Sequence, residues 1–244
     1  MNRTSSVSDT AFVLHAVPYK ETSLIVELFC REAGRLPVVA KGAKRPHSGL
    51  RAVLVSFQPV HVRFSGRSEV KTLMSAEWAG GLLAPTDKAL FSAYYLNELL
   101  MRGLGREDAH PELFDSYALA LAALADGEDM TVVVRRFEIE LLQALGYGLT
   151  LDHDAEGAAI QADSVYVWLN EVGWANSDGL GVMPSDDLGV DVGVPGQVLI
   201  DLNAGLLTRS AASALKMVTR KMLTAHVAPN GVLSRAWMEQ LIKA

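Results

Sequence analysis

A cluster of unneutralised positive charge carries the clearest chemistry in this sequence. Lys41, Lys44, Arg45 and Arg51 fall within eleven residues, and no carboxylate lies among them. Cations this close repel one another unless an anion is near. Two glycines and a proline in the same stretch predict a non-helical loop whose backbone can approach a ligand. The segment therefore predicts a phosphate-binding loop without Walker spacing. A solvated loop that promotes solubility is the alternative.

The distribution of charge along the chain supports a local polyanion site. The 244 residues carry a formal charge of -6. Residues 1–78 hold 11 Lys and Arg against 6 Asp and Glu, whereas residues 79–201 hold 5 against 21. Residues 202–244 hold 6 against 1. A basic first third on an acidic chain indicates that a polyanion would bind there rather than over the whole surface.

The basic first third has the pattern of β-strands. Short apolar runs rich in Val, Ile and Phe are separated by Pro and Gly, and a predicted hairpin turn at residues 65–68 joins the last two. The predicted strands are 11–17, 23–30, 36–40, 55–64 and 69–76. Five short strands in about 75 residues are typical of a small OB-type barrel, a common scaffold for single-stranded nucleic acid.

Two further cations extend the predicted polyanion surface. Alternation along the fourth strand places Arg63 on its polar face, and Arg67 falls in the hairpin turn. Phe57 and Phe64 are candidates for stacking on bases. Phe64 shares its strand face with valines, so a place in the core is favoured for it.

From Asp87 the apolar spacing becomes helical. Three segments each show apolar residues three or four apart, and Gly146-Tyr147-Gly148 resembles a C-terminal cap. The stripes are Leu96, Leu99, Leu100 and Leu104; then Leu113, Tyr117, Leu121 and Leu124; then Val133, Phe137 and Leu141. These predict a helical bundle over residues 81–150 that follows a barrel over residues 1–80. Its acidic outer face would keep nucleic acid off most of its surface.

The adjacent pair Arg135-Arg136 stands out in the third of these helices. Arg136 lies four residues before Glu140, which favours an ordinary intrahelical ion pair. The alternative is a docking point for an acidic segment of a partner beside the apolar surface of the bundle.

Residues 151–244 form a third region of weaker pattern. Val165–Leu169 predicts one strand of a hairpin, and helices are predicted over 208–225 and 234–243. Ala211, Leu215, Val218 and Met222 form an apolar stripe in the first of these helices. Lys216 and Arg220 lie four apart on its exposed face, where like charges favour a nearby anion. That anion is either the acidic middle of this chain or a second polyanion contact.

The sequence predicts no enzyme site, metal or cofactor. Cys30 is the single cysteine, which excludes a disulfide framework and a multi-cysteine zinc site. Asp152-His153-Asp154 resembles metal ligands, but three adjacent residues in regular structure cannot all face one ion. The other histidines are dispersed, without a nucleophile or a carboxylate pattern. With a polar N-terminus and no run approaching the roughly 18–20 apolar residues of a membrane span, the cytosol is the expected compartment.

These residues together resemble the RecO DNA repair and recombination-mediator proteins of bacteria, strongly over residues 11–150 and more thinly after that. Each motif alone is weak, but their order and spacing together are specific. The motifs are Ala11-Phe12-Val13-Leu14-His15, Tyr19-Lys20-Glu21-Thr22-Ser23-Leu24, Glu32-Ala33-Gly34-Arg35, Val39-Ala40-Lys41-Gly42-Ala43, Phe57-Gln58-Pro59, Tyr95-Leu96-Asn97-Glu98-Leu99, Arg135-Arg136-Phe137-Glu138 and Leu145-Gly146-Tyr147-Gly148.

The resemblance implies an α+β multidomain protein, in which an N-terminal five-stranded OB-type β-barrel precedes a mostly α-helical domain and a packed C-terminal region. It implies binding of single- and double-stranded DNA and annealing of complementary strands. The implied partners are single-stranded DNA-binding protein, through its acidic C-terminal tail, and RecR, so that the recombinase RecA can load. It implies a cytoplasmic protein that associates with the nucleoid during repair. Some members carry a four-cysteine zinc site, which this sequence lacks.

The expected DNA surface joins the loop cations to Arg35, Arg63 and Arg67, and Arg135 and Arg136 are the expected contacts for the acidic tail. Two other function classes stay open. A nuclease would need clustered carboxylates or a histidine site, and the basic segment has neither. A pure protein-interaction adaptor would use its basic barrel to bind an acidic protein rather than DNA.

Overall fold

The computed structural model describes residues 6–177 and 193–234, and their packing divides the chain into two compact units. The first unit comprises Met1–Glu128 with Val232–Ala244, and the second comprises Asp129–Gly231. The domain boundaries expected at residues 80 and 150 stay predictions. No helix in the described ranges is long and apolar enough to cross a lipid bilayer.

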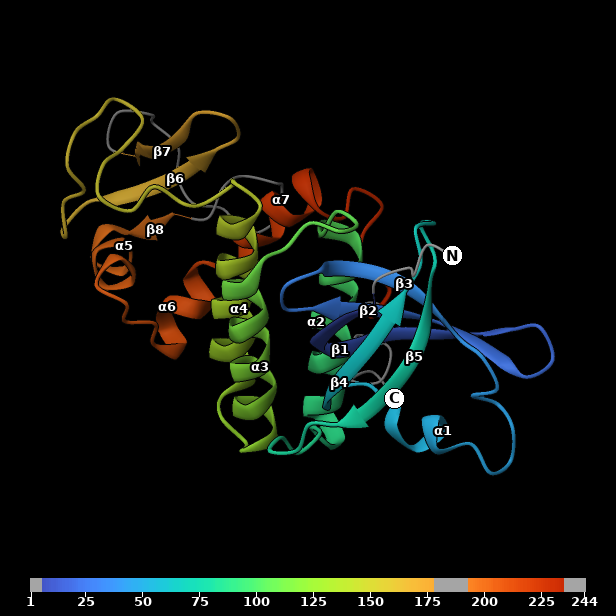
Figure 1. Cartoon of the computed structure of the whole chain (residues 1–244). Coiled ribbons are helices and arrows are strands. Elements are labelled where there is room, and N and C mark those ends of the chain that lie inside the picture. The colour runs from blue at the N-terminus through green and yellow to red at the C-terminus, as the bar shows by residue number, and fades with distance from the viewer. Residues whose placement is uncertain (1–5, 178–192, 235–244) are drawn as a thin grey trace. The chain divides into compact units, whose positions relative to one another are not determined.

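The N-terminal strands close into a five-stranded barrel (Figure 1). The strands are β1 (Val7–Tyr19), β2 (Ser23–Cys30), β3 (Gly34–Ala40), β4 (Pro59–Ser65) and β5 (Lys71–Trp78). Their order around the barrel is β1-β2-β3-β5-β4, and β4 also pairs with β1 to close it. β3 and β5 run parallel, whereas the other pairs are antiparallel. This arrangement confirms the OB-type barrel.

Alternating apolar side chains fill the barrel. On β2 the inward positions Val26, Leu28 and Cys30 are completely buried, and the facing strands add Leu36, Val38 and Val60. Burial in this apolar interior raises the pKa of the Cys30 thiol, and the nearby charge of Asp9 raises it further. The single cysteine is therefore a core residue and not a reactive one.

The segment between β3 and β4 departs from the prediction in two places. The expected loop ends in a short helix, α1 (Gly49–Val53), because Leu50 and Val53 pack against the barrel core. Arg51 is therefore helical. The strand expected from residue 55 begins only at Pro59, since Phe57 has φ +70°, which a strand cannot adopt.

Two helices cover one side of the barrel within the first unit: α2 (Asp87–Gly103) and α3 (Pro111–Ala125). Four aromatic rings form the contact. Phe12 lies 5.1 Å from Phe114 and 5.0 Å from Tyr117, and Phe29 lies 5.4 Å from Phe114, between ring centroids. All four are buried, so this contact is a continuous apolar layer between the sheet and α3.

A buried polar contact orients α2 on the same surface. The Asn97 side-chain amide donates to the Leu14 carbonyl of β1 at 2.9 Å, and the Tyr117 hydroxyl donates to the amide oxygen of Asn97. Burial raises the pKa of Tyr117 and keeps its hydroxyl protonated as a donor. Each polar group in this apolar layer thus has a partner, as burial requires.

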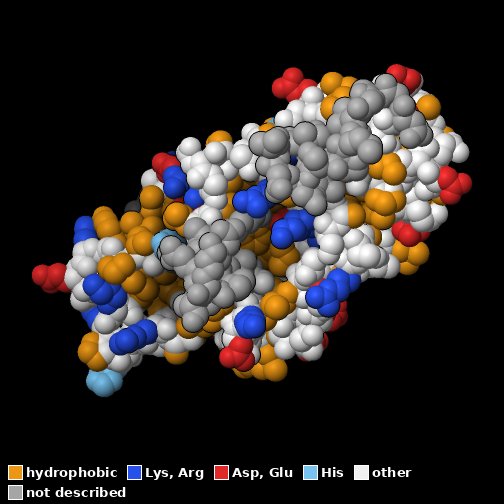
Figure 2. Space-filling view, turned by 180° about the vertical axis from the view of Figure 1, so that it is seen from behind, with side chains coloured by type: hydrophobic (Ala, Val, Ile, Leu, Met, Phe, Trp, Pro, Cys, Tyr) orange, Lys and Arg blue, Asp and Glu red, His pale blue; other side chains and the backbone are white. Residues whose placement is uncertain are grey.

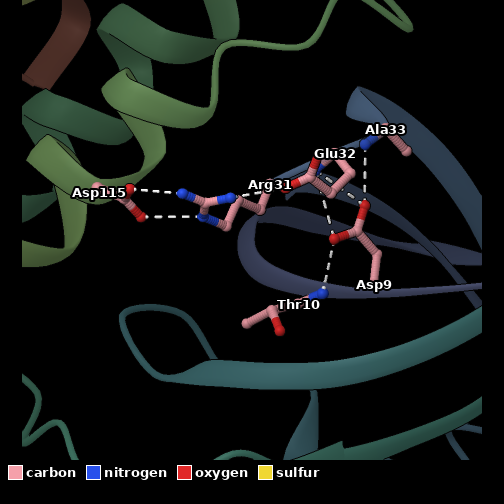
Figure 3. Close-up of polar contacts among 6 residues, drawn as sticks. All are labelled: Asp9, Thr10, Arg31, Glu32, Ala33 and Asp115. Carbon is pink, nitrogen blue, oxygen red and sulfur yellow. Dashed lines mark hydrogen bonds and ion pairs between the residues drawn. The ribbon is translucent and has the colours of Figure 1, made fainter.

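The turn between β2 and β3 is held from both sides (Figure 3). Asp9 accepts the backbone N–H groups of Glu32 and Ala33 at 3.1 and 2.8 Å. Arg31 donates two parallel hydrogen bonds to Asp115 of α3, at 3.1 and 2.8 Å, and this contact lowers the pKa of the Asp115 carboxyl. The turn therefore joins the barrel to the helix by a planar, bidentate contact.

The segment that links α2 to α3 packs against the first residues of β3. The Glu107 backbone N–H donates to the Arg35 carbonyl at 2.8 Å, and Lys71 of β5 pairs with the Glu107 carboxylate at 2.7 Å. Gly34 has φ +70°, and a Cβ there would overlap the backbone of Asp108. A glycine is required at this position for both reasons.

The second unit begins with α4 (Met130–Ala144), whose first turn is capped by the Asp129 carboxylate. A small sheet of order β7-β6-β8 follows, and confirms the expected hairpin at Val165–Leu169. The other elements of the second unit are β6 (Val165–Leu169), β7 (Gly173–Asn176), β8 (Val194–Pro195), α5 (Gly196–Asn203), α6 (Arg209–Ala214) and α7 (Lys216–His226).

The helices of this unit differ from the prediction. The single helix expected over residues 208–225 is broken at Leu215, which separates α6 from α7. The expected helix 234–243 lies almost entirely outside the described residues.

Residues just before the chain end return to α2. The Glu98 carboxylate accepts the backbone N–H groups of Leu233 and Ser234, each at 2.8 Å, and pairs with Arg102 at 2.7 Å. Burial alone would raise the pKa of Glu98, but these donors outweigh it and hold that pKa below its usual range.

Replacement of Gly34 should destabilise the first unit strongly. Gly34→Ala meets both the positive φ and the Asp108 backbone, so the free energy of unfolding should fall by more than about 1 kcal/mol. Gly80→Ala is the control, because Gly80 has φ +79° but nothing near the position of its Cβ. In urea unfolding, Gly34→Ala should have a much lower free energy of unfolding than Gly80→Ala. Equal losses of unfolding free energy in the two variants would contradict the proposed overlap.

Replacement of Glu98 should cost stability only where its carboxylate is ionised. Glu98→Gln should lower the free energy of unfolding at pH 7 by about 1–2 kcal/mol. Because the folded-state pKa is depressed, this contribution is complete above the unfolded value of about 4.3 and is lost as the pH falls through the folded pKa. Urea titrations should show wild type and variant converging as the pH falls from about 5 to 3. Glu128→Gln, at an exposed site, is the control.

Candidate nucleic-acid interface

The segment that follows β3, residues 41–51, has exposed cations on a backbone that is attached to the barrel. Ala43 is completely buried in the barrel core, and the Lys44 backbone N–H donates to the Thr22 carbonyl at 2.9 Å. The side chains of Lys44 and Arg45, which follow Ala43, are exposed. The backbone of this segment is thus attached to the barrel, while the charged ends of its lysine and arginine side chains are exposed to solvent.

Six of the seven cations expected to contact DNA are exposed on the barrel. None of them forms an ion pair with a carboxylate in the described ranges. Figure 2 shows lysine and arginine side chains gathered over the barrel, at the left of that view. We call the following set the barrel cations: Lys41, Lys44, Arg45, Arg51, Arg63 and Arg67.

The strand pairing explains how separate segments contribute to this set. β3 and β5 run side by side with Val38 opposite Lys71, so the turn that carries Arg67 and the segment that follows β3 extend from neighbouring strands. Arg63 lies on the outer face of β4, opposite Ser8 of β1 and Ser75 of β5. Both of these cross-strand neighbours are uncharged.

The turn between β1 and β2 adds a cation that sequence reasoning missed. Lys20 is exposed with φ +53°, and its ammonium lies 5.2 Å from the centroid of the Tyr19 ring. The hydrogen bond from Lys44 to Thr22 places this turn beside the basic segment. The signal was available, because the loop between the first two strands is a usual ligand contact in OB-type barrels.

Arg35 differs from the barrel cations, although it was expected among them. Its side chain is largely buried, pairs with Glu27 at 3.3 Å and donates to the Leu104 carbonyl at 3.0 Å. Its charge is therefore neutralised inside the protein, and its role is to attach β3 to the end of α2. We leave Arg35 out of the interface for this reason.

Arg135 was expected to contact a partner at the surface, but the structure places it in the interior. Its side chain is buried in the second unit, where it donates to the Ala212 carbonyl at 3.0 Å and bonds to Glu138 and Thr219. Thr219 in turn donates to Glu138 at 2.7 Å. This network joins α4 to α6 and α7, so Arg135 cannot reach an acidic partner segment.

Exposed cations do remain in the second unit. Arg136, the neighbour of Arg135, is exposed on α4, and Lys216 and Arg220 are exposed on α7. Within the described part of the chain none of these three forms an ion pair. Each of the three is exposed enough for an acidic partner or a polyanion to contact it.

The two phenylalanines considered for base stacking are both interior. Phe57 and Phe64 are each 3% exposed. Phe64 belongs to the barrel core, as its strand pattern indicated, and Phe57 is covered by the Tyr94 ring at 4.9 Å. Neither offers a free face to a base.

The described part of the chain holds no ligand set for zinc. The one cysteine lies in the barrel core. His153 contacts Asp152 at 2.7 Å, while Asp154 accepts backbone N–H groups of its own turn. Among residues 6–177 and 193–234, no three His, Cys, Asp or Glu side chains are grouped to hold a metal ion.

Comparison with known proteins agrees with this architecture. The family model "Recombination protein O N terminal" matches residues 1–82, and "Recombination protein O C terminal" matches residues 88–186. The chain is 45% identical over 236 residues to the DNA repair protein RecO of Azoarcus sp. (strain BH72), covering 96% of both chains. It is 41% identical to the protein of that name from Laribacter hongkongensis (strain HLHK9), over 95% of this chain and 93% of the relative.

A third relative, the DNA repair protein RecO of Ralstonia nicotianae (strain ATCC BAA-1114 / GMI1000), is 45% identical over 89% of this chain and 78% of its own length. The two family models match in chain order, the first over the OB-type barrel. With identity above 40% over almost the whole length of the first two relatives, this chain belongs to the recombination protein O (RecO) family.

Proposed function

We propose that this protein is a non-enzymatic DNA repair and recombination mediator whose barrel binds single- and double-stranded DNA. The observation that carries the proposal is the set of six exposed barrel cations without carboxylate partners in the described chain. The names of the relatives, DNA repair protein RecO, support the same conclusion.

The barrel cations act by neutralising phosphates. If all six engage a single strand, the logarithm of affinity should fall with the logarithm of salt concentration at a slope of roughly -4. Phosphate contacts carry no base information, so sequence preference should be low. A surface of this kind should bind DNA strands regardless of their base sequence.

Strand annealing follows from the same contacts. Two complementary strands repel each other through their phosphates, and a surface that cancels part of this charge brings them together. Base pairing then supplies the free energy, so no nucleotide hydrolysis is needed. This mechanism requires no catalytic group, and a nuclease would need a metal or histidine site that the basic segment does not offer.

The proposed protein partners are single-stranded DNA-binding protein and RecR, with loading of the recombinase RecA as the outcome. The acidic tail of single-stranded DNA-binding protein would place a carboxylate on an exposed arginine. Arg136 is the member of the expected pair that is exposed. Mediation on coated strands then combines DNA binding by the barrel with a protein contact in the second unit.

Charge reversal in the basic segment should weaken DNA binding. With Lys44→Glu and Arg45→Glu combined, affinity for a labelled oligonucleotide should fall, and the salt slope should flatten by about 1.4 because two phosphate contacts are lost. Fluorescence anisotropy titrations at several salt concentrations measure both. Lys88→Glu, at an exposed cation of α2, is the matched control for a single charge reversal. An unchanged titration would remove this segment from the DNA surface.

The two adjacent arginines of α4 should behave differently. Arg135→Ala leaves Glu138 buried without its cation, so the free energy of unfolding should fall by about 3–5 kcal/mol. Arg136→Ala should leave unfolding and binding of naked DNA unchanged, and lower affinity for a peptide that copies the acidic tail. Urea unfolding and peptide titration separate the two effects. If Arg136→Ala binds the peptide like wild type, the tail contact lies elsewhere.

A further inference from the structure

Trp78 is an exposed aromatic ring that the fold itself does not use. It is the last residue of β5, and 59% of its surface is accessible to solvent. In the second unit, by contrast, Trp174 is 1% exposed and Trp168 packs against it at 5.2 Å. Tryptophan is a large apolar side chain whose burial is strongly favourable, so a ligand that covered this ring would gain free energy from the contact.

The position of Trp78 places its ring at one end of the barrel. Trp78 pairs with Val60 of β4, and Ala76, two residues earlier, packs on the barrel core. Alternation puts Trp78 on the same side of β5 as Ala76, at the last residue of the strand. Glu77 points to the opposite face, where it lies across from His61. No carboxylate of β5 therefore shares the side of the tryptophan ring.

One of the barrel cations lies on the helix next to β5. α1 packs against β5 and lies beside the end of that strand where Trp78 is found (Figure 1). Arg51 in α1 is exposed and belongs to the barrel cations. An exposed ring on a barrel that also carries exposed cations is the combination that holds single strands, with phosphates on the cations and bases on the ring.

We propose that Trp78 is a base-stacking residue that makes the barrel prefer single-stranded over double-stranded DNA, a proposal that rests on the proposed DNA binding. A base of a single strand has a free face to offer to the indole. A base inside a duplex already stacks on its neighbours, so the ring gains nothing there. The barrel cations, which contact only phosphates, do not make this distinction.

The test compares three variants of the full-length protein on one oligonucleotide, single-stranded and as a duplex. Trp78→Ala should lower single-strand affinity about tenfold and leave duplex affinity and the salt slope unchanged. Trp78→Phe should keep most of the single-strand affinity, because a phenyl ring still stacks. Leu83→Ala is the control, since Leu83 is 78% exposed but carries no ring.

A spectroscopic readout makes the contact direct. Tryptophan emission of the wild type should be quenched by the single strand, and the Trp78→Phe variant should lose that quenching. Equal single-strand affinity in wild type and Trp78→Ala, or unchanged quenching in Trp78→Phe, overturns the proposal while DNA binding by the barrel cations stands. If the wild type binds neither DNA form, the proposed function itself fails.

Discussion

The aromatic layer between the barrel and α3 is the interaction on which the first unit depends. Phe12 and Phe29 project outward from β1 and β2 and would be an exposed apolar patch on an isolated barrel. α3 covers them with Phe114 and Tyr117, and Asn97 of α2 adds a buried hydrogen bond to β1. One outer side of the barrel is thereby committed to packing, which leaves ligand binding to the turns, to α1 and to the remaining strands.

Positive side chains in this protein serve two purposes, and the presence or absence of a carboxylate partner separates them. Arg31, Arg35 and Arg135 each meet a carboxylate, and each joins two elements of its own unit. Lys44, Arg45 and Arg67 follow strand ends, and none of the three forms an ion pair within the described residues. An arginine that forms part of the packing is therefore not available to phosphate, however basic its surroundings look in the sequence.

Much of the fold could be predicted from the sequence because local patterns determine it. Alternating runs located the strands, and apolar spacing located α2, α3 and α4. The burial of Arg135 could not be predicted in this way, because the stripe of Val133, Phe137 and Leu141 indicates only one apolar face. α6 and α7 both pack on α4, so the buried arc widens to include Arg135 and Glu138. The spacing of these two opposite charges, three residues apart, was the available signal.

Arg35 and Trp78 are two further residues whose exposure could not be predicted from the sequence. Arg35 is neutralised by Glu27 and by the carbonyl of Leu104, which is distant in the chain, and no local pattern reveals that carbonyl. Trp78 ends a strand whose alternation predicts an inward side chain, but 59% of its surface is exposed. Both outcomes depend on tertiary packing, which local patterns do not contain.

The anchoring of Ala43 in the barrel core has a thermodynamic consequence. A free basic loop would lose backbone entropy when it ordered on DNA, and this cost would weaken binding. Here the buried Ala43 and the hydrogen bond from Lys44 to Thr22 already hold the backbone, while the long lysine and arginine side chains are exposed. In the proposed complex with DNA, their charged ends exchange one phosphate for the next with little rearrangement. A strand held in this way would slide along the protein while it remains bound, which would let two strands find their complementary register before they pair.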